Sequence, residues 1–321
     1  MSLTDVDRAA LETTDEVKKT ERAAMRATRR MQRRGNEGDD SGMAAARGGS
    51  KWFVLIGLIL FTIYSIGPAW WLIVSATKSK EQLYTTNGLW FADFNLFQNL
   101  SSLFTYQDGI FGVWLGNSTL YALAGAAGQT LVALAAGYGL AMYQFRGKGT
   151  SMAFIIGSFL IPGALLTIPS YLLFVQIGIY DTVWAMILPA FFGPFSVYLA
   201  KVYTEGAMPP ELMEAARIDG AGEFRIFFQI AMPLATPVLA TLGILTFLGS
   251  WNSFIYPLVM AQEPEMYTLP VALATFATGQ YQADHGMLMA GALVLILPVL
   301  IIFVLLQRWI TEGIATTGLK G

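Results

Sequence analysis

The 321-residue chain contains no cysteine and a single histidine, His285. Disulfide bonds, thiolate nucleophiles and cysteine-ligated metals are therefore excluded, and so is a metal site built from several histidines. Charged residues are scarce too, because they make up 13% of the chain, whereas soluble domains carry about 25%. Hydrophobic residues reach 55%. This composition indicates a protein that spans a membrane.

Residues 1–50 differ from the rest, because they are rich in charge and, from Gly35 on, in glycine. They include a purely basic run: Arg22, Arg26, Arg29, Arg30, Arg33 and Arg34. An acidic beginning argues against a secretory signal, so we expect a cytoplasmic extension that is disordered or partly helical. Its basic run either binds anionic lipid or only helps to set the topology, and both interpretations stay open.

The remaining residues, 51–321, are interpreted as one all-α domain with six membrane-spanning helices. Each apolar segment is long enough to cross the hydrocarbon core, and prolines at Pro162 and Pro169 are expected to break the third. Residues 77–109 and 260–286 are interpreted as external loops and 177–182 as a turn. The expected spans are residues 52–76, 112–143, 151–176, 183–203, 233–259 and 287–307.

The distribution of cations predicts the orientation of these spans. With the N-terminus in the cytoplasm, only Lys78 and Lys80 fall on the outer side. Cytoplasmic loops of membrane proteins carry the excess of Lys and Arg, so both termini are expected inside. The cations that then lie on the cytoplasmic side are Arg146, Lys148, Lys201, Arg217, Arg225, Arg308 and Lys320.

A polar island at residues 205–233 separates the fourth and fifth spans. Pro210 is a favourable first residue of a helix, and Glu211 and Glu214 suit its positively polarised beginning. Gly220 stands where a helix commonly ends in a left-handed residue. We expect a hairpin of two short helices, residues 210–219 and 222–229, held by a soluble partner. The alternative is an amphipathic helix that lies on the membrane.

The amino-acid sequence of this island resembles a known family signature. Glu214-Ala215-Ala216, Gly220 and Ile230-Ala231-Met232-Pro233 resemble the signature of ABC-importer permeases, with Met232 in place of the usual Leu. The resemblance extends over about residues 52–321 and points to the carbohydrate-uptake branch, within it to the shorter, six-helix partner of a maltose-type permease pair. It rests on Asn117-Ser118, Phe145-Arg146-Gly147-Lys148, Trp251-Asn252, Pro257-Leu258, Gln307-Arg308-Trp309 and Gly318-Leu319-Lys320-Gly321.

The resemblance implies a type I importer permease fold in a bacterial or archaeal cytoplasmic membrane. It implies a coupling surface on an ABC ATPase, comprising Glu211, Glu214, Ala215, Ala216, Arg217, Asp219 and Gly220. It also implies that the tail, residues 310–321, reaches the ATPase through Gly318, Leu319 and Lys320, although a frayed terminus is the alternative.

The implied partners are a second permease chain, two ATPase copies, an extracytoplasmic sugar-binding protein and membrane lipid, with no nucleic acid. The chain is expected to be no enzyme and to hold no metal or cofactor, with ATP and Mg bound by the ATPase. Indeed Gly147-Lys148 lacks the P-loop context, because Met142 replaces the first glycine and Gly149 the Ser or Thr.

Polar residues in the spans are the candidates for the transport pathway, because an unpaired polar group facing lipid is costly. They are Asn117, Gln176, Trp251, Asn252 and Tyr256, with Gln129 as a further polar group. Each is equally interpreted as a helix-packing residue. The spans hold almost no titratable groups, which disfavours an ion-driven transporter and a membrane-embedded enzyme. A neutral sugar is favoured as cargo, with a polyol or glycerol phosphate as alternatives.

Overall fold

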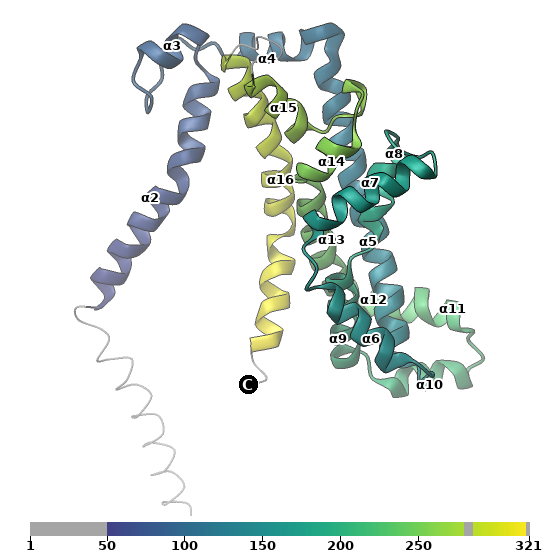
Figure 1. The fold of residues 1–321 in the computed structure, drawn as a ribbon. Coiled ribbons are helices and arrows are strands. Elements are labelled where there is room, and N and C mark those ends of the chain that lie inside the picture. The colour runs from purple at the N-terminus through teal and green to yellow at the C-terminus, as the bar shows by residue number, and fades with distance from the viewer. Residues whose placement is uncertain (1–49, 279–284, 319–321) are drawn as a thin grey trace, which may run out of the picture. The chain divides into compact units, whose positions relative to one another are not determined.

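The computed structural model describes residues 50–278 and 285–318 (Figure 1). The basic extension that precedes Ser50 lies outside these residues, as does the chain end after Gly318. Throughout the described part the regular elements are helices. The chain divides into two units, residues 1–69 and 70–321, which are considered separately.

The first unit contributes the beginning of α2 (Ser50–Ala76), a 27-residue helix. Between Trp52 and Ala69 its large apolar side chains are exposed, for example Phe53 at 80% and Tyr64 at 80%. An apolar helix with no protein cover is stable only in lipid, where its backbone bonds are satisfied internally. The first predicted span is confirmed, because Trp52–Ala76 is long and apolar enough to cross a membrane.

The segment predicted as an external loop, residues 77–109, is largely helical. The segment forms α3 (Lys80–Thr85), α4 (Leu96–Thr105) and a short 3-10 turn, η1 (Tyr106–Gly109). Its polar side chains bind the free backbone groups at helix ends. Ser79 and Gln82, for example, form a capping box at the beginning of α3, in which each side chain accepts from the backbone N–H of the other residue. The buried Asn99 amide donates to the carbonyl oxygens of Ala76 and Lys78, each at 2.9 Å, which holds α4 to the end of α2.

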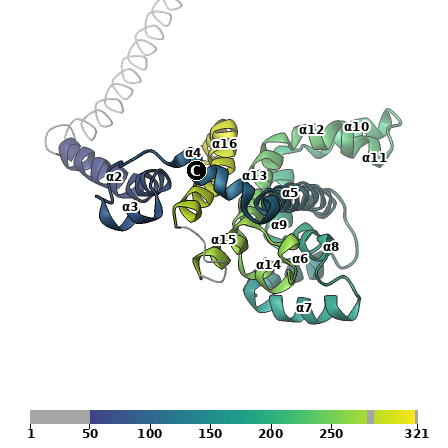
Figure 2. The same cartoon turned by 90° about the horizontal axis from the view of Figure 1, so that it is seen from above.

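The second predicted span is confirmed as α5 (Ile110–Met142), the helix at the centre of the second unit. All three hydrophobic clusters of this unit contain α5 side chains. Phe111 and Trp114 belong to the first cluster, Leu134 and Tyr138 to the second, and Tyr121 to the third. Helices from before and after it in the sequence therefore pack against α5, and the view from above shows it among them (Figure 2).

The third span is broken, as expected, but only once. Its two helical parts, Lys148–Ser158 and Gly163–Gln176, meet at a bend of 97° around Pro162. The predicted break at Pro169 is wrong, because this proline lies in the first turn of its helix, where no backbone N–H is needed. The elements are α6 (Lys148–Ser158), η2 (Gly163–Leu166) and α7 (Thr167–Gln176).

The fourth span follows the predicted turn and extends beyond its expected end. Val183–Ala207 meets the length and hydropathy of a membrane span, whereas the sequence suggested an end at Tyr203. Three elements compose it: α8 (Val183–Ile187), η3 (Pro189–Phe191) and α9 (Pro194–Ala207).

The fifth span is shorter than predicted at both ends. Its helix α13 (Thr236–Trp251) begins after a bend of 77°, and Pro233 lies in the preceding arm rather than in the span. It ends at Trp251 because Asn252 follows as its C-terminal cap, and both the backbone and side-chain amides of Asn252 donate to the Leu248 carbonyl. Residues 255–260 form a separate helix, α14 (Ile255–Met260).

The predicted loop at 260–286 contains a buried helix. After η5 (Pro264–Met266), α15 (Leu269–Ala277) buries one side in the first hydrophobic cluster. Its nine residues are too few to span a membrane. The sixth span, α16 (His285–Gly318), is confirmed and continues past the expected end at Gln307. Six spans result if each bent helix pair counts as one.

Glycines on α5 allow the neighbouring helices to approach closely. A Cβ atom at Gly137 would lie 2.6 Å from the Lys201 backbone nitrogen and 2.7 Å from the Ala200 Cβ. At Gly128 it would lie 2.3 Å from the Phe191 ring. The contacts of α5 with α9 and with η3 therefore depend on the absence of a side chain at Gly137 and Gly128, respectively.

This contact generates a prediction. Gly137→Ala should lower the free energy of unfolding by about 1–3 kcal/mol, because the added methyl overpacks against backbone atoms. Gly139→Ala is the matched control, since nothing lies within 4 Å of its Cβ position. It should be neutral or stabilising by up to about 1 kcal/mol, the usual gain in a helix. Thermal unfolding in detergent measures both, and equal behaviour of the two variants would contradict the close contact.

Candidate functional site

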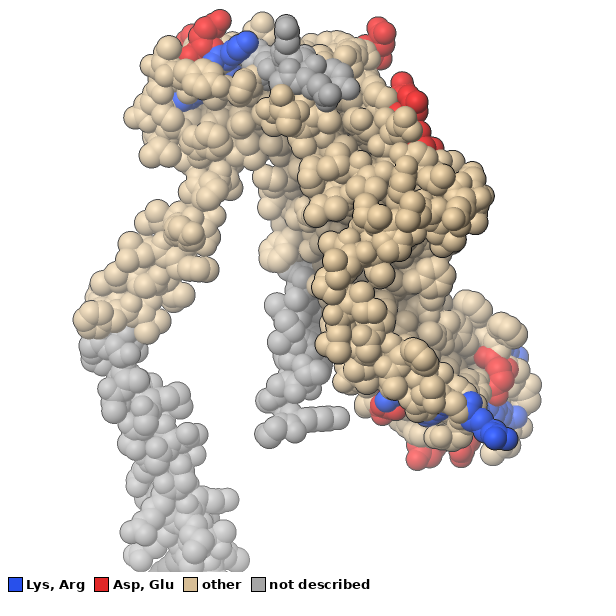
Figure 3. All heavy atoms as spheres, in the orientation of Figure 1, with Lys and Arg blue, Asp and Glu red and all other residues tan. Residues whose placement is uncertain are grey.

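The predicted hairpin is present and occupies one end of the second unit. Its first helix is α10 (Pro210–Ile218). The second arm contains α11 (Glu223–Ile226), a π-helical stretch η4 (Phe227–Ala231) and α12 (Met232–Leu234). Charged side chains gather around α10 and α11 and again at the opposite end, with an uncharged surface between them (Figure 3). This pattern is typical of a protein whose two ends project from a membrane.

The turn between the arms has the geometry that Gly220 predicts. Gly220 has a φ of +80°, a conformation that costs other residues about 1–2 kcal/mol. The Gly220 and Ala221 amides donate to the Arg217 and Ala216 carbonyls, both at 3.0 Å, and close the end of α10. Nothing lies within 4 Å of a Cβ at Gly220, so the requirement for glycine here is conformational rather than spatial.

One face of the hairpin is anchored in the second hydrophobic cluster. Met208, Met213 and Ile226 are almost completely buried there, against Tyr138 of α5 and Ala200 of α9. Each such side chain contributes about 1.5–3 kcal/mol when buried. The hairpin is therefore part of the folded unit and not a freely hinged loop.

The opposite face is exposed and carries apolar side chains among acidic ones. Ile218 is 86% exposed and Phe224 84%, the two highest values among the large apolar residues of the described chain. Leu212 is 42% exposed beside them. None of these three residues was predicted to be functional from the sequence, although Ile218 lies five positions from the buried Met213 and hence off the core face of α10. Large apolar groups that extend into water favour contact with a partner protein.

The residues predicted for ATPase coupling are distributed over both faces. Glu211, Glu214, Ala215, Asp219 and Gly220 are exposed, whereas Ala216 is half-buried. Their contact with an ATPase stays a prediction.

Arg217 is exposed, but its guanidinium is bound within the hairpin. The Nε atom donates to Glu223 Oε1 at 2.7 Å and an Nη atom to Oε2 at 3.3 Å. The Tyr143 hydroxyl at the end of α5 also donates to Glu223, and Arg217 lies over the Tyr143 ring, 5.9 Å from its centre. We call Tyr143, Arg217 and Glu223 the Tyr143 joint. The sequence analysis did not assign Tyr143 or Glu223 a role.

The electrostatics of the joint favour its bonded form at neutral pH. Hydrogen bonds from Arg217 and then from Tyr143 hold the pKa of Glu223 below its ordinary value of 4.5. Burial, followed by the bond to Glu223, raises the pKa of the Tyr143 hydroxyl to about 12. The bond to Glu223 likewise raises the pKa of Arg217. A lowered carboxyl pKa stabilises the fold above the unfolded value, so this contribution is lost as the pH falls through the folded pKa of Glu223.

At the other end of α5, the predicted pathway residue Asn117 bonds to the protein itself. Its amide nitrogen donates to the Glu265 carbonyl at 2.6 Å and to the Tyr267 carbonyl at 3.1 Å. The Trp114 indole donates to the Pro264 carbonyl at 2.7 Å, and the Ser118 hydroxyl accepts from the Leu269 amide at 2.7 Å. These side chains fasten the segment 264–269 to α5.

The cluster Trp251, Asn252 and Tyr256 does not share one helix, because α13 ends at Trp251 and α14 begins at Ile255. These three residues therefore do not lie on one continuous helix face. Trp251 is 1% exposed, stacks on Phe247 and donates to the Leu295 carbonyl. Tyr256 donates to the Ala185 carbonyl at 2.9 Å.

Asn252 and Gln176 are the exposed members of the predicted pathway set. The further polar residue, Gln129, is half-buried and donates to the Ser196 hydroxyl at 2.8 Å. Any role of this set in transport stays a prediction.

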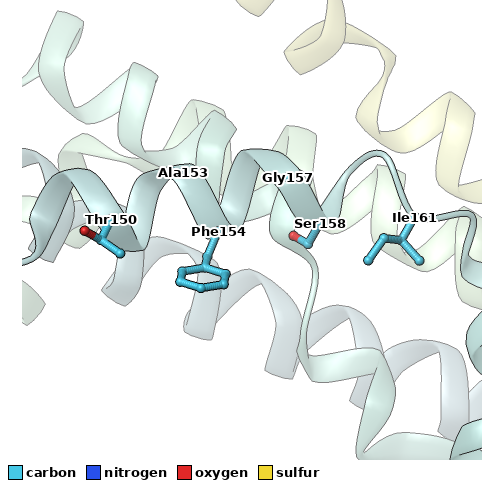
Figure 4. Close-up of a pocket in the computed structure, with 6 residues that line it drawn as sticks. All are labelled: Thr150, Ala153, Phe154, Gly157, Ser158 and Ile161. Carbon is cyan, nitrogen blue, oxygen red and sulfur yellow. The ribbon is translucent and has the colours of Figure 1, made fainter.

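A hollow of about 330 Å³ lies along the exposed face of α6 (Figure 4). Its wall offers only two hydroxyls, and that of Ser158 already donates to the Ile155 carbonyl at 2.7 Å. A hollow so poor in hydrogen-bonding groups does not suit a sugar. The lining residues are Thr150, Ala153, Phe154, Gly157, Ser158 and Ile161.

The described residues contain no group of three or more His, Asp or Glu side chains arranged to hold a metal ion. Of the predicted tail contacts, Leu319 and Lys320 lie outside the described residues, and Gly318 is the last residue of α16. The tail therefore begins as a continuation of that helix.

Residues 129–316 match the family described as binding-protein-dependent transport system inner membrane component. The chain is 35% identical to the arabinooligosaccharides transport system permease protein AraQ of Halalkalibacterium halodurans, over 84% of this chain and 97% of that protein. It is 30% identical to the lactose transport system permease protein LacG of Rhizobium radiobacter, over 80% of this chain and 92% of that protein. The chain therefore belongs to the family of inner-membrane permease components of binding-protein-dependent ABC transport systems.

The fold is shared with a solved structure, a bacterial ABC transporter involved in the import of the acidic polysaccharide alginate. The match has a TM-score of 0.70 at 21% identity and covers 81% of this chain and 98% of that chain. A type I importer permease fold, as predicted, is thus confirmed.

The left-handed turn at Gly220 generates a prediction. Gly220→Ala should destabilise the hairpin by about 1–2 kcal/mol, because alanine resists a positive φ. Gly206→Ala near the end of α9 is the control, since its Cβ position is also empty and its φ is not positive. Hydrogen exchange of the α10 and α11 amides should accelerate in the first variant and not in the second. Equal exchange in both would show that the turn does not depend on the conformation of glycine.

Proposed function

We propose that this chain is the transmembrane permease subunit of an ATP-driven carbohydrate importer, and that its exposed hairpin surface docks on an ABC ATPase. The observation that carries the proposal is a hairpin anchored by Met213 and Ile226 that extends Ile218 and Phe224 into water. A cleft on a soluble partner would bury these apolar groups, and Glu211, Glu214 and Asp219 would meet its cations.

The proposal includes the orientation and the partners of the chain. The hairpin and both termini lie in the cytoplasm, where the ATPase binds ATP and Mg, while this chain contributes half of the translocation pathway. A second permease chain supplies the other half, and an extracytoplasmic binding protein delivers the cargo. The excess of Lys and Arg on the hairpin side of the spans supports this orientation.

A carbohydrate cargo is supported by the relatives, whose names refer to arabinooligosaccharides, lactose and maltodextrin. The chain itself contributes no cation to the middle of its described spans, which favours a neutral cargo over a phosphorylated one. Motion of the ATPase subunits would displace the hairpin and convert an inward-facing cavity into an outward-facing one.

The first test is purification of the tagged chain in mild detergent, followed by mass identification of the bound proteins. We expect a second multi-span permease and an ABC ATPase. Proteoliposomes that contain the complex and the binding protein should then accumulate a labelled neutral oligosaccharide only when ATP is inside. Uptake driven by an ion gradient without an ATPase would contradict the proposal, and exclusive uptake of glycerol phosphate would contradict the carbohydrate assignment.

A second prediction concerns the hairpin surface. Ile218→Ser and Phe224→Ser should each weaken binding of the ATPase about tenfold or more, because a large buried apolar side chain contributes about 1.5–3 kcal/mol. Leu89→Ser is the control, an equally simple change at a 61% exposed leucine in the segment between α3 and α4. Surface-immobilised complex titrated with purified ATPase measures the affinities. Unchanged affinity of both hairpin variants for the ATPase would show that Ile218 and Phe224 are not part of the docking surface.

A charge reversal tests the predicted acidic residues separately. Glu214→Lys should abolish ATP hydrolysis that depends on the binding protein while membrane insertion of the chain is retained, because a cation then opposes the cations of the ATPase. Normal uptake by this variant in proteoliposomes would show that Glu214 does not contact the ATPase.

A further inference from the structure

The hairpin is connected to α5 by side chains that are distant in sequence. Glu223 and Tyr143 are 80 residues apart, yet the tyrosine hydroxyl donates to the carboxylate. Behind this bond the rings of Tyr138 and Phe227 lie 5.4 Å apart at an angle of 63°, and Tyr138 also contacts Tyr143. The end of α5 therefore holds the second arm of the hairpin by one polar and one aromatic contact.

We propose that the Tyr143 joint is the point at which a displacement of the hairpin enters α5, and that α5 carries it to the segment 264–269. Tyr143 is thus a positioning residue for transport. This inference rests on the proposed function and adds the route by which the docking surface acts on the opposite end of the chain.

The bonds of the joint connect three elements, namely α10, α11 and the end of α5. Arg217 and Glu223 stand on opposite sides of the Gly220 turn, so their paired hydrogen bonds lock the two arms together. Tyr143 then attaches the locked arms to α5. The side chains of Arg217 and Glu223 are 37% and 47% exposed, so the ion pair alone adds little stability. The ion pair matters for orientation, because its two hydrogen bonds, together with the bond from Tyr143, fix how the two arms are oriented against α5.

From the joint, α5 provides a continuous path to the other end of the unit. Its 33 residues form a helix of about 50 Å, and Figure 1 shows it extending from the α10–α11 end to the α15 end. The four hydrogen bonds between residues 264–269 and the side chains of Trp114, Asn117 and Ser118 lie at that far end. A rigid helix bonded at both ends moves both attachments together.

The route differs from simple movement of the chain that flanks the hairpin. Through the backbone, the hairpin continues into α9 and α13, both of which adjoin α5. The Tyr143 joint bypasses these connections, because it binds the hairpin directly to a helix that neither precedes nor follows it. Removing the joint should therefore leave the hairpin folded and reduce the transmission of its movement.

The test uses the full complex in proteoliposomes and measures sugar taken up per ATP hydrolysed. Tyr143→Phe removes the hydroxyl but keeps the ring that contacts Tyr138 and Arg217. We expect the ratio to fall about fivefold, the lower range of allosteric couplings, with unchanged thermal unfolding and unchanged ATPase affinity. Glu223→Gln weakens the bonds to both Tyr143 and Arg217, so it should lower the ratio at least as much. Adding Tyr143→Phe to it should lower the ratio little further, because the two residues share one hydrogen bond. Arg225→Gln is the matched control, since Arg225 lies on the same arm and bonds Gln229 of that arm.

A spectroscopic readout tests the far end. The chain has no cysteine, so Glu81→Cys and Glu263→Cys introduce a unique pair of spin labels. We expect the distance between them to change with nucleotide in the otherwise unaltered complex and not in Tyr143→Phe. The inference would be overturned if Tyr143→Phe kept the wild-type ratio of sugar taken up to ATP hydrolysed, or the wild-type change in label distance. It would also be overturned if the label distance in the otherwise unaltered complex did not change with nucleotide. A complex that binds no ATPase would instead overturn the proposed function.

Discussion

The close approach of helices to α5 is the constraint on which the second unit depends. In lipid, helices gain little from burying apolar surface, so contact requires small residues at the crossing points. Gly128 and Gly137 leave no room for a methyl group against η3 and α9. Because α5 contributes to all three hydrophobic clusters, a change in its position would reach the hairpin, the broken third span and the buried helix α15 together.

This arrangement explains how one chain combines a rigid core with a docking surface. The hairpin is polar enough to leave the membrane, yet Met213 and Ile226 return to a core that also contains α5 and α9. A partner that binds the exposed Ile218 and Phe224 therefore acts on a surface continuous with the transmembrane packing. The same pattern, with buried and exposed apolar residues on one short helix, is what a coupling element requires.

Much of this organisation follows from the sequence, since apolar length and cation placement predict the spans and Pro210 and Gly220 predict α10. The failures have physical causes. Pro169 did not break a helix because it occupies a first turn, where its missing N–H has no cost. α15 was missed because a nine-residue apolar segment is buried by tertiary contacts that its own letters do not show. The Tyr143 joint was invisible for the same reason, because a contact between residues 80 positions apart leaves no periodic signal.

The 77° bend between the second arm and α13 has a mechanical consequence. Residues 223–234 form a lever of about 18 Å at the usual helical rise, and the buried Ala235 is its fulcrum. The Tyr203 hydroxyl, which donates to the Leu234 carbonyl at 3.2 Å, steadies that fulcrum from α9. A swing of about 10° around it would move the outer tip of the lever by about 3 Å, on the scale of one side-chain contact. Any rotation about the bend therefore has its largest effect at the exposed tip of the hairpin, where Phe224 extends into water.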